Sequence, residues 1–430
     1  MSASPVSPVS SVLSLARPRP APAAGSWRRV AFAMFAVGWG ANQFSPMLLV
    51  YRQQLGLAPG PLAGLFAIYA AALIPGLLIG GPASDRFGRR PVVIPFVIAS
   101  PVATLLVMSG AHALPVLAAG RALAGVCSGV VFAAATAWVR ELSPDAGTGA
   151  RRAAVALTAG FGLGPLVASL FAQWAGDPLL VPYLPHVVLG VTAAATVLAA
   201  PSGEPASAGE TGPAGEPGRP RPEARRGWPP AAVRSLRFWL AVAPAAPWVF
   251  GCAALAFVVL PADVTAPDGL AIVFAGAVGA LALGAGVAVQ PLARRLAARS
   301  RLAGNVAGLG CAAAGSALML AVLAAGSTAL AVICAVLFGL GYGLCLVTGL
   351  RESERLAGPG DQGAVVACYY VLTYLGFGFP YLADVLDSAA GRAAAFITLA
   401  ATALALAAWT AVYGAGSRAA RTTLSGPGTP

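Results

Sequence analysis

The sequence has little charge and no lysine. Only 10% of its 430 residues are charged, whereas about 25% are charged in ordinary soluble domains. Hydrophobic residues make up 58% of the chain, and its mean hydropathy is +0.78. These values exclude an ordinary soluble protein and predict a chain that crosses a membrane many times. All 27 basic residues are arginines, which together with the abundant alanine, glycine and proline indicates a GC-rich coding genome.

The net charge of +12 does not indicate a nucleic-acid partner, because the arginines lie in short loops between apolar runs. The six cysteines all lie inside apolar runs and form no CxxC pair, so neither a disulfide framework nor a metal site is predicted. A membrane enzyme would need a convergent cluster of His, Asp, Glu or Cys at the interface, and the sequence indicates none. We therefore expect no enzyme activity, no metal and no cofactor.

About twelve apolar segments are long enough to cross a bilayer. A hydrocarbon core of ~30 Å requires ~20 helical residues. The sequence therefore predicts an all-α membrane protein with twelve transmembrane helices. The segments lie near residues 29–50, 62–80, 92–112, 114–138, 152–174, 182–200, 238–260, 269–290, 302–324, 328–350, 362–383 and 390–413.

The distribution of arginines predicts the orientation, since short cytoplasmic loops are rich in Arg. If both termini are cytoplasmic, 24 of the 27 arginines lie on the cytoplasmic side. Only Arg52 and Arg392 then lie outside, and Arg121 lies within a span. We therefore predict a multi-pass protein of the cell (plasma or inner) membrane with both termini in the cytoplasm.

Two polar tails and a polar linker divide the chain. Residues 201–237 contain Pro, Gly, Ser, four Glu and six Arg, a composition that cannot bury a core. We expect a disordered cytoplasmic tail (1–28), an N-terminal six-helix bundle (29–200), a cytoplasmic linker (201–237), a C-terminal six-helix bundle (238–413) and a cytoplasmic tail (414–430). A membrane sensor would need a folded soluble domain, and the longest polar segment is this linker.

The two halves show signs of duplication. Shifting the second half by about 215 residues aligns the segment 161–165 with 376–380, and Gly125 with Gly341 at nearly the same offset. The segment 290–296 is a degenerate copy of the stretch 80–91. We therefore expect two pseudo-symmetric bundles with a substrate path between them, near the membrane midplane.

A short charged loop, residues 80–91, lies between the second and third predicted spans. It has the pattern Gly, Asp four residues later, Arg, a spacer, Gly and two basic residues; Ala83 and Ser84 depart from the common Leu-Ala. In a twelve-span chain with a central linker, this loop resembles the signature loop of the major facilitator superfamily. The motif residues are Gly81, Asp85, Arg86, Gly88, Arg89 and Arg90.

The resemblance implies that this loop is a cytoplasmic latch. Asp85 would contact the start of span eleven near residues 361–363, and Arg89 would pair with Glu141 at the end of span four. Gly81 and Gly88 would permit close approach and a tight turn. In the alternative interpretation, the charges of the loop only set the topology.

Arg121 lies ~10 Å below the outer surface, where a lipid-facing guanidinium costs at least ~2.5 kcal/mol. We expect it to face the central cavity, with snorkelling to the outer interface as the alternative. The sequence from Gly120 to Gly125 is similar to a motif of proton-linked drug exporters in which this Arg is tied to proton transfer. In span five, Gly160, Gly164 and Pro165 resemble the glycine-proline motif of the family's antiporters. Plain helix packing is the alternative there.

The group that carries protons is not evident from the sequence. No Asp or Glu lies in the middle of a span, and Asp384, near the outer end of span eleven, comes closest. His112 and His186 lie at outer span ends, where we expect interfacial positions rather than a relay. Candidate polar and aromatic residues of the cavity, for which helix packing is the alternative, are Trp39, Asn42, Gln43, Tyr369, Tyr370 and Tyr374.

Together these features predict a secondary active transporter of the twelve-span drug/proton antiporter branch. It would export a small organic or drug-like compound in exchange for protons, with the proton gradient as its energy source. The alternative is an uptake symporter or facilitator for a small polar or anionic metabolite, in which Arg121 binds the anion. The expected partners are the small-molecule substrate and the lipid bilayer, and the chain is expected to be a monomer.

Overall fold

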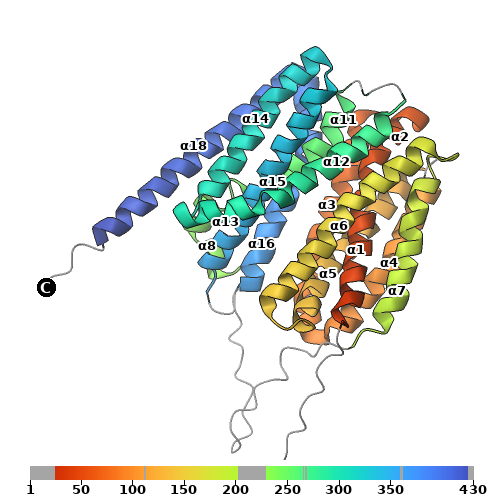
Figure 1. Ribbon diagram of the computed structural model, residues 1–430, viewed down its shortest axis with the longest axis horizontal. Helices are drawn as coiled ribbons and strands as arrows, with labels where there is room; N and C mark the ends of the chain where they lie inside the picture. Colours follow the sequence, from red (N-terminus) through yellow and green to blue (C-terminus); the bar gives the residue numbers. More distant parts are fainter. Residues whose placement is uncertain are drawn as a thin grey trace, which may run out of the picture.

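The computed structural model describes residues 25–110, 113–201, 229–264, 266, 269–358 and 362–424. Within these ranges every regular element is a helix, and the helices form two groups that lie side by side (Figure 1). The first group is coloured red to yellow-green and the second green to blue. The predicted tail 1–24 and most of the predicted linker, 202–228, lie outside the described residues.

The first group holds the helices of the N-terminal half. Its α5 packs against α3 and α4, and its α1 packs against α6. The elements are α1 (Trp27–Asn42), α2 (Phe44–Leu55), α3 (Pro59–Phe87), α4 (Arg89–Ser109), α5 (Leu114–Glu141), α6 (Ala146–Trp174), the 3-10 turn η2 (Val181–Tyr183) and α7 (Leu184–Leu198).

The second group holds the helices of the C-terminal half, in which α14 packs against α15 and α18. Its elements are α8 (Ala231–Arg234), α9 (Leu236–Ala241), α10 (Ala246–Ala254), the π-helical turn η4 (Leu255–Val259), α11 (Leu260–Ala262), α12 (Ala271–Ala288), α13 (Gln290–Arg299), α14 (Ala303–Ala325), α15 (Thr328–Leu356), α16 (Gln362–Tyr374), the 3-10 turn η5 (Leu375–Gly378), α17 (Phe379–Ala390) and α18 (Arg392–Leu424).

Eleven helical stretches in the described part of the chain are long and apolar enough to cross a membrane. The first of the twelve predicted spans is not among them, because it is divided at Gln43 into α1 and α2. Pro46 cannot donate a backbone hydrogen bond to the carbonyl of Asn42. The hydroxyl of Ser45 donates to that carbonyl instead, over 2.9 Å. The all-helical membrane fold is confirmed, and the first predicted span corresponds to two consecutive shorter helices.

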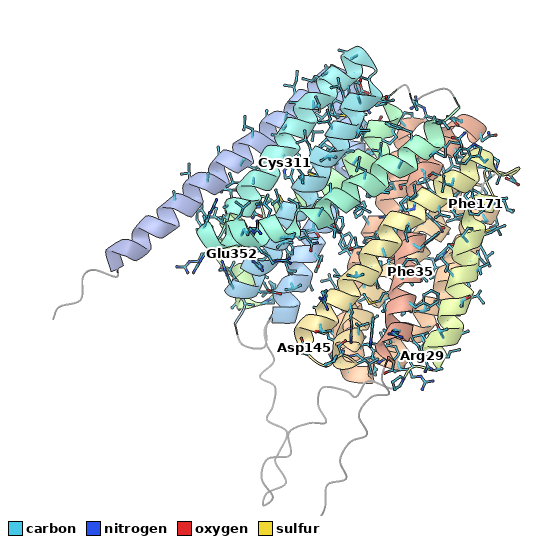
Figure 2. All side chains as sticks on the ribbon, viewed as in Figure 1. Arg29, Phe35, Asp145, Phe171, Cys311 and Glu352 are labelled. Atoms are coloured by element: carbon cyan, nitrogen blue, oxygen red, sulfur yellow. The ribbon has the colours of Figure 1, made fainter. Side chains whose placement is uncertain are left out.

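Glycines set the closest approaches between neighbouring helices. A Cβ atom on Gly129 of α5 would lie 2.2 Å from the carbonyl oxygen of Leu73 on α3. On Gly160 of α6 it would lie 2.3 Å from the carbonyl oxygen of Phe35, which Figure 2 labels on α1. In a bilayer, helix association depends on such close contact of backbones rather than on a difference in hydrophobicity.

The two groups meet near one end of the molecule. Helices α6 and α12 lie against each other near the top of Figure 1 and diverge toward the bottom. Their contact involves the last third of α6 and the first turns of α12, at the ends that the arginine distribution assigns to the outer side. A second contact joins α3 to α16, η5 and α17.

Candidate functional site

The charged segment 80–91, predicted as a loop, comprises the end of α3, Gly88 and the start of α4, and its contacts centre on Arg89, whose side chain is only 6% exposed. Its Nε donates to Glu141 at the end of α5 over 2.8 Å, and its Nη1 donates to Ser84 over 2.7 Å. A further hydrogen-bonded ion pair joins Arg89 to Asp85. The expected contact between Arg89 and Glu141 is therefore present, and its role as a latch stays a prediction.

The other residues of this loop differ in their surroundings. Gly88 has φ +91°, so the predicted tight turn is present. The close approach expected at Gly81 is wrong, because a Cβ there would meet no described atom within 4 Å. It occurs one residue earlier, where a Cβ on Gly80 would lie 2.7 Å from the Cα of Val130.

Two more arginines belong to this loop. Arg90 donates to the carbonyl of Leu198 over 2.6 Å, and the guanidinium of Arg86 lies 5.2 Å from the ring centroid of Phe87. The Asp85 side chain is 61% exposed. Its predicted contact is with the start of span eleven near residues 361–363, of which Asp361 lies outside the described residues, and that contact remains a prediction.

Arg121 is buried in the N-terminal group, with 1% of its surface exposed. Its Nε donates to the carbonyl of Leu65 over 3.3 Å, and its Nη1 donates to that of Ala41 over 3.4 Å. The guanidinium carbon lies 4.2 Å from the ring centroid of Phe44 and 4.6 Å from that of Tyr69. In this conformation Arg121 is enclosed by protein, and its expected place in the central cavity stays a prediction. Because desolvated cations gain from aromatic faces, the two rings offset part of the burial cost.

A chain of polar side chains continues from the vicinity of Arg121 toward α7. Gln43 donates to the hydroxyl of Thr104 over 3.3 Å, and this hydroxyl lies 2.7 Å from Nδ1 of His186. Ser100 Oγ lies 3.5 Å from Nε2 of the same ring. His186 is 1% exposed, so the interfacial position expected for it is wrong. His112 lies outside the described residues.

Two patterns in the sequence are consistent with this buried histidine. Gly40 of α1 leaves the space that the ring occupies, since a Cβ there would lie 2.4 Å from His186 Nε2. Ser100 and Thr104 are four residues apart on α4 and therefore share a face of that helix. Neither pattern identifies a histidine partner without knowledge of which helices adjoin.

Trp39 and Asn42 lie where α1 meets α6. Asn42 Nδ2 approaches the carbonyl of Phe161 at 3.5 Å, which fits the alternative of interhelical bonding. A Cβ on Gly164 would lie 2.6 Å from the carbonyl oxygen of Trp39. The glycines of the expected antiporter motif thus allow α6 to approach α1.

The next residues of the same motif face the other half of the protein. A Cβ on Gly276 of α12 would lie 2.0 Å from Ser169 Oγ and 2.8 Å from the carbonyl oxygen of Pro165. Nearby, Gln173 Oε1 accepts hydrogen bonds from the backbone N–H groups of Ile272 and Val273, over 3.2 and 3.4 Å. The end of α6 therefore holds the first turn of α12 by close packing and by capping its free N–H groups.

The aromatic residues of span eleven differ in which half of the protein they contact. Tyr369 is fully buried inside the C-terminal group, and its hydroxyl donates to the carbonyls of Cys345 and Leu346 on α15. Its neighbour Tyr370 packs against it, with ring centroids 5.8 Å apart. Tyr374 stacks with Phe250 at 4.5 Å. These three tyrosines therefore contact residues of their own half.

Phe377 contacts the opposite half of the protein as well as its own. Its ring centroid lies 5.2 Å from that of Phe66 and 6.2 Å from that of Tyr69, both on α3. It also stacks with Phe250 at 5.0 Å and with Tyr374 at 5.7 Å. An apolar aromatic layer thus joins the two halves. It includes Tyr69, whose ring lies under the guanidinium of Arg121.

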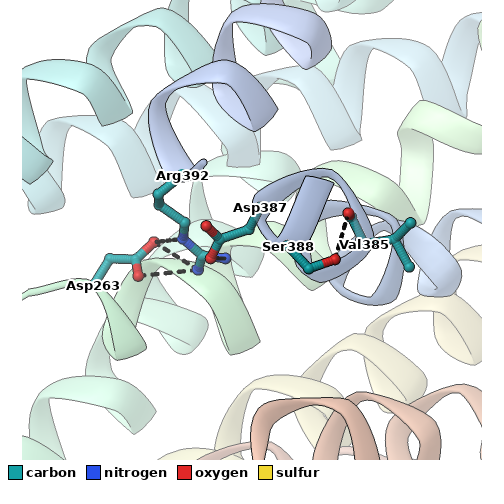
Figure 3. Close-up of polar contacts among 5 residues, drawn as sticks. All are labelled: Asp263, Val385, Asp387, Ser388 and Arg392. Atoms are coloured by element: carbon teal, nitrogen blue, oxygen red, sulfur yellow. Dashed lines mark hydrogen bonds and ion pairs between the residues drawn. The ribbon is translucent and has the colours of Figure 1, made fainter. Parts of the chain in front are cut away.

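Asp384 lies at a cavity of ≈ 80 Å³ on the predicted outer side, between the two halves. This cavity is also lined by Arg52 and Arg392. Figure 3 shows Arg392 donating to both carboxylate oxygens of Asp263, over 2.8 to 3.0 Å, and reaching Asp387 at 3.4 Å. Burial raises the pKa of the Asp263 carboxyl, which Arg392 lowers in part. No cluster of three His, Cys, Asp or Glu suitable for a metal ion occurs among the described residues.

Comparison with known proteins places the chain among transporters. A sequence model described as the Major Facilitator Superfamily matches residues 30–380. The chain is 33% identical over 124 residues to the inner membrane transport protein YnfM of Escherichia coli, covering 27% of this chain and 29% of YnfM. It is 30% identical over 137 residues to the multidrug resistance protein MdtL of Klebsiella pneumoniae, covering 32% and 31%. The quinolone resistance protein NorA of Staphylococcus aureus is 27% identical over 145 residues, covering 33% and 37%. The matches thus span about a third of these relatives' length.

Solved structures resemble the whole chain in fold. The transporter PepTSo of the POT family has a TM-score of 0.71 at 14% identity, covering 91% of this chain and 98% of that one. A D-xylose–proton symporter has a TM-score of 0.64 at 14% identity, covering 89% and 96%. At such identities the likeness concerns the fold alone.

Proposed function

This chain belongs to the major facilitator superfamily, and we propose that it exports a small organic or drug-like compound in exchange for protons. It is a multi-pass membrane transporter that binds a small molecule within the membrane and works by alternating access, the general mechanism of its family. The finer statement, proton-coupled drug export, is supported by the partial likeness to MdtL and NorA.

The single observation that carries the proposal is the path from Arg121 to the interface between the halves. Tyr69 lies under the guanidinium of Arg121 and at the same time against Phe377 of the C-terminal half. The ring stack formed by Phe66, Phe250, Tyr374 and Phe377 would suit a flat, mostly apolar compound. The buried charge of Arg121 would therefore couple the conformation of the N-terminal group to the aromatic contacts that a bound substrate would replace.

In the proposed cycle residues 29–200 rock against residues 238–413, with both termini in the cytoplasm of the cell. The contacts of α6 with α12 then close the outer side, so this conformation faces inward. In the outward-open conformation the latch around Asp85 would contact the start of α16. The glycine-proline segment of α6 would serve as the surface along which the halves slide.

Transport in inside-out vesicles tests this proposal. Norfloxacin, a quinolone, is the probe, and an imposed pH gradient with the acid side inside is the driving force. Gradient-driven accumulation of norfloxacin above that in vesicles without the protein supports export. Uptake only in right-side-out vesicles contradicts it and favours the alternative of a symporter. A D-xylose–proton symporter has the same fold.

Arg121 gives the first prediction. Arg121→Ala removes the buried charge and its two carbonyl contacts, so we expect gradient-driven transport to fall to background while membrane insertion persists. Quantitative blotting of the membrane fraction measures insertion. Arg121→Lys, which keeps the charge but not the planar donors, is the matched variant and should recover part of the activity. Full transport by Arg121→Ala would remove Arg121 from the mechanism.

A further inference from the structure

We propose that His186 is the residue that takes up and releases the transported proton. The inference rests on the proton-coupled transport proposed above. In the described part of the chain, the acidic residues of the spans lie near their ends, as Asp85, Glu141, Glu352 and Asp384 do. His186 lies in the first turn of α7, which places it level with Gly40, near the middle of the segment formed by α1 and α2. An imidazole is the side chain whose charge ordinarily changes near neutral pH.

The hydrogen bonds around His186 fit a neutral ring whose Nδ1 accepts from Thr104. Gln43 donates its amide N–H to Thr104 Oγ1, which leaves the hydroxyl proton of Thr104 to be donated to His186 Nδ1. The ring N–H is then Nε2–H, and the backbone carbonyl of Ala36 accepts a hydrogen bond from the ring. A proton would therefore add at Nδ1, and the Thr104 hydroxyl would turn from donor to acceptor.

The groups that face this ring include no carboxylate among the described residues. Helix α4 contributes Ser100 and Thr104, and α1 contributes the backbone around Gly40. One charged group, Arg121, lines a cavity of ≈ 10 Å³ together with Thr104, Gln43 and Tyr183. Tyr183 in turn shares a hydrogen bond of 2.7 Å with Tyr51. This conformation therefore suits the uncharged imidazole, the state expected after a proton has left toward the cytoplasm.

Protonation of His186 would act on Arg121 through this cavity. Gln43 Oε1 and Arg121 Nη2 have no hydrogen-bond partner among the described atoms, and about one water molecule fits a cavity of this size. A second positive charge on the far side of Thr104 repels the guanidinium, whose carbonyl contacts of 3.3 and 3.4 Å are long. Movement of Arg121 is passed to Tyr69, which packs against Phe377 of the other half.

The proton balance of the cycle is simple. Neutral His186 takes up one proton at Nδ1 in the outward-facing conformation and becomes an imidazolium. After the change to the inward-facing conformation it releases that proton to the cytoplasm and returns to the neutral ring. The substrate moves in the opposite direction in the other half of the cycle. No bond other than N–H forms or breaks.

Transport by the purified full-length protein in liposomes tests the role of His186, with norfloxacin as the probe. Two activities are measured: accumulation driven by a pH gradient, and norfloxacin exchange at equal pH on both sides. For His186→Asn we expect exchange to persist and gradient-driven accumulation to be lost. His112→Asn changes the chain's other histidine and should retain both activities. A wild-type protein that exchanges norfloxacin without any response to the gradient refutes the proposed function itself. A wild type that responds, together with a His186→Asn variant that responds equally, refutes only the role of His186.

A second measurement does not depend on any substrate. In His112→Asn protein, His186 is the sole histidine, and its ¹⁵N NMR signals report protonation of the ring. We expect the ring to take up a proton at a higher pH in a variant that favours the outward-facing conformation, Gly276→Ala, than in the unmodified background. The titration runs from about pH 8 to about pH 5, which brackets ordinary histidine ionisation. Identical curves, or a ring neutral throughout in both proteins, would overturn the proposal. If His186→Asn also abolishes exchange, the NMR result decides.

Discussion

Replacement of Gly276 by alanine should shift the protein away from the conformation described here. Gly276 lies in the second turn of α12 and is buried against the end of α6. An added Cβ would lie 2.0 Å from Ser169 Oγ, 2.5 Å from Ser169 Cβ and 2.8 Å from the carbonyl oxygen of Pro165. The hydroxyl could rotate at the loss of its hydrogen bond to Leu166, but the Cβ and the backbone carbonyl cannot. The two helices must therefore separate.

The size of the effect follows from the cost of overpacking. Extra methyl groups forced into a packed interface typically cost about 1–3 kcal/mol. Because the contact joins the two halves, this cost applies to the conformation closed on the predicted outer side and not to one in which α6 and α12 have parted there. A bias of this size changes the ratio of the two conformations by about 5- to 150-fold. The fold of each half should be unaffected.

The accessibility of a cysteine at position 49 measures this shift. Leu49 lines the outer cavity between the halves, so a Leu49→Cys side chain should react faster with a membrane-impermeant maleimide when that side opens. The reagent is added to intact cells, and protein without the introduced cysteine gives the background from the six native ones. Gly284→Ala, on the same helix, is the matched control, because a Cβ there would meet no described atom within 4 Å.

We expect faster labelling in Gly276→Ala than in either the unmodified Gly276 protein or Gly284→Ala. Equal labelling rates in all three would show that the close contact of Gly276 with Ser169 does not limit opening. Faster labelling in Gly284→Ala as well would indicate a general effect of alanine on α12. Either result would refute the reasoning from this contact.

Three further predictions concern other contacts. Gly160→Ala should lower the apparent melting temperature in detergent, since its Cβ would lie 2.3 Å from the carbonyl oxygen of Phe35. Gly162→Ala, which has open space around it, should leave the melting temperature unchanged. Equal melting temperatures of the two variants would argue against close α1–α6 packing. Asp85→Asn should weaken norfloxacin transport without changing the sidedness of the termini, measured with a terminal epitope tag; unchanged transport would return the loop to a role in topology alone. Because burial raises the pKa of Asp263, this carboxylate takes up a proton at a higher pH than an exposed one, and its pair with Arg392 is lost as the external pH falls. The protection of amides at the start of α18, measured by hydrogen exchange relative to their intrinsic rates at each pH, should therefore fall on acidification in the wild type but not in Asp263→Asn, and an equal fall in both would contradict this.

The sequence determined the features that depend on local composition. Apolar length fixed the positions of the spans, because any helix that crosses the hydrocarbon core needs about 20 apolar residues whatever its neighbours are. The first span is divided at Gln43, where Ser45 bonds the carbonyl freed by Pro46, and the seventh and eleventh are also interrupted, between α9 and α10 and at η5. The resemblance of the charged segment 80–91 to the family's signature loop implied the contact of Arg89 with Glu141, which the structure contains. The loop motif itself can be found within a short stretch of sequence.

The tertiary structure alone decided which side chains meet. His186 seemed interfacial from its place in a short span, yet it lies against Gly40, 146 positions earlier, and bonds to Thr104. Arg121 was expected in a central cavity but is enclosed by the rings of Phe44 and Tyr69. Hydropathy is nearly uniform around a buried membrane helix, so it does not indicate how each helix is rotated or which neighbour it faces. Those rotations, set by backbone contacts at glycines such as Gly160 and Gly276, place the buried charge, the imidazole and the aromatic layer along one path.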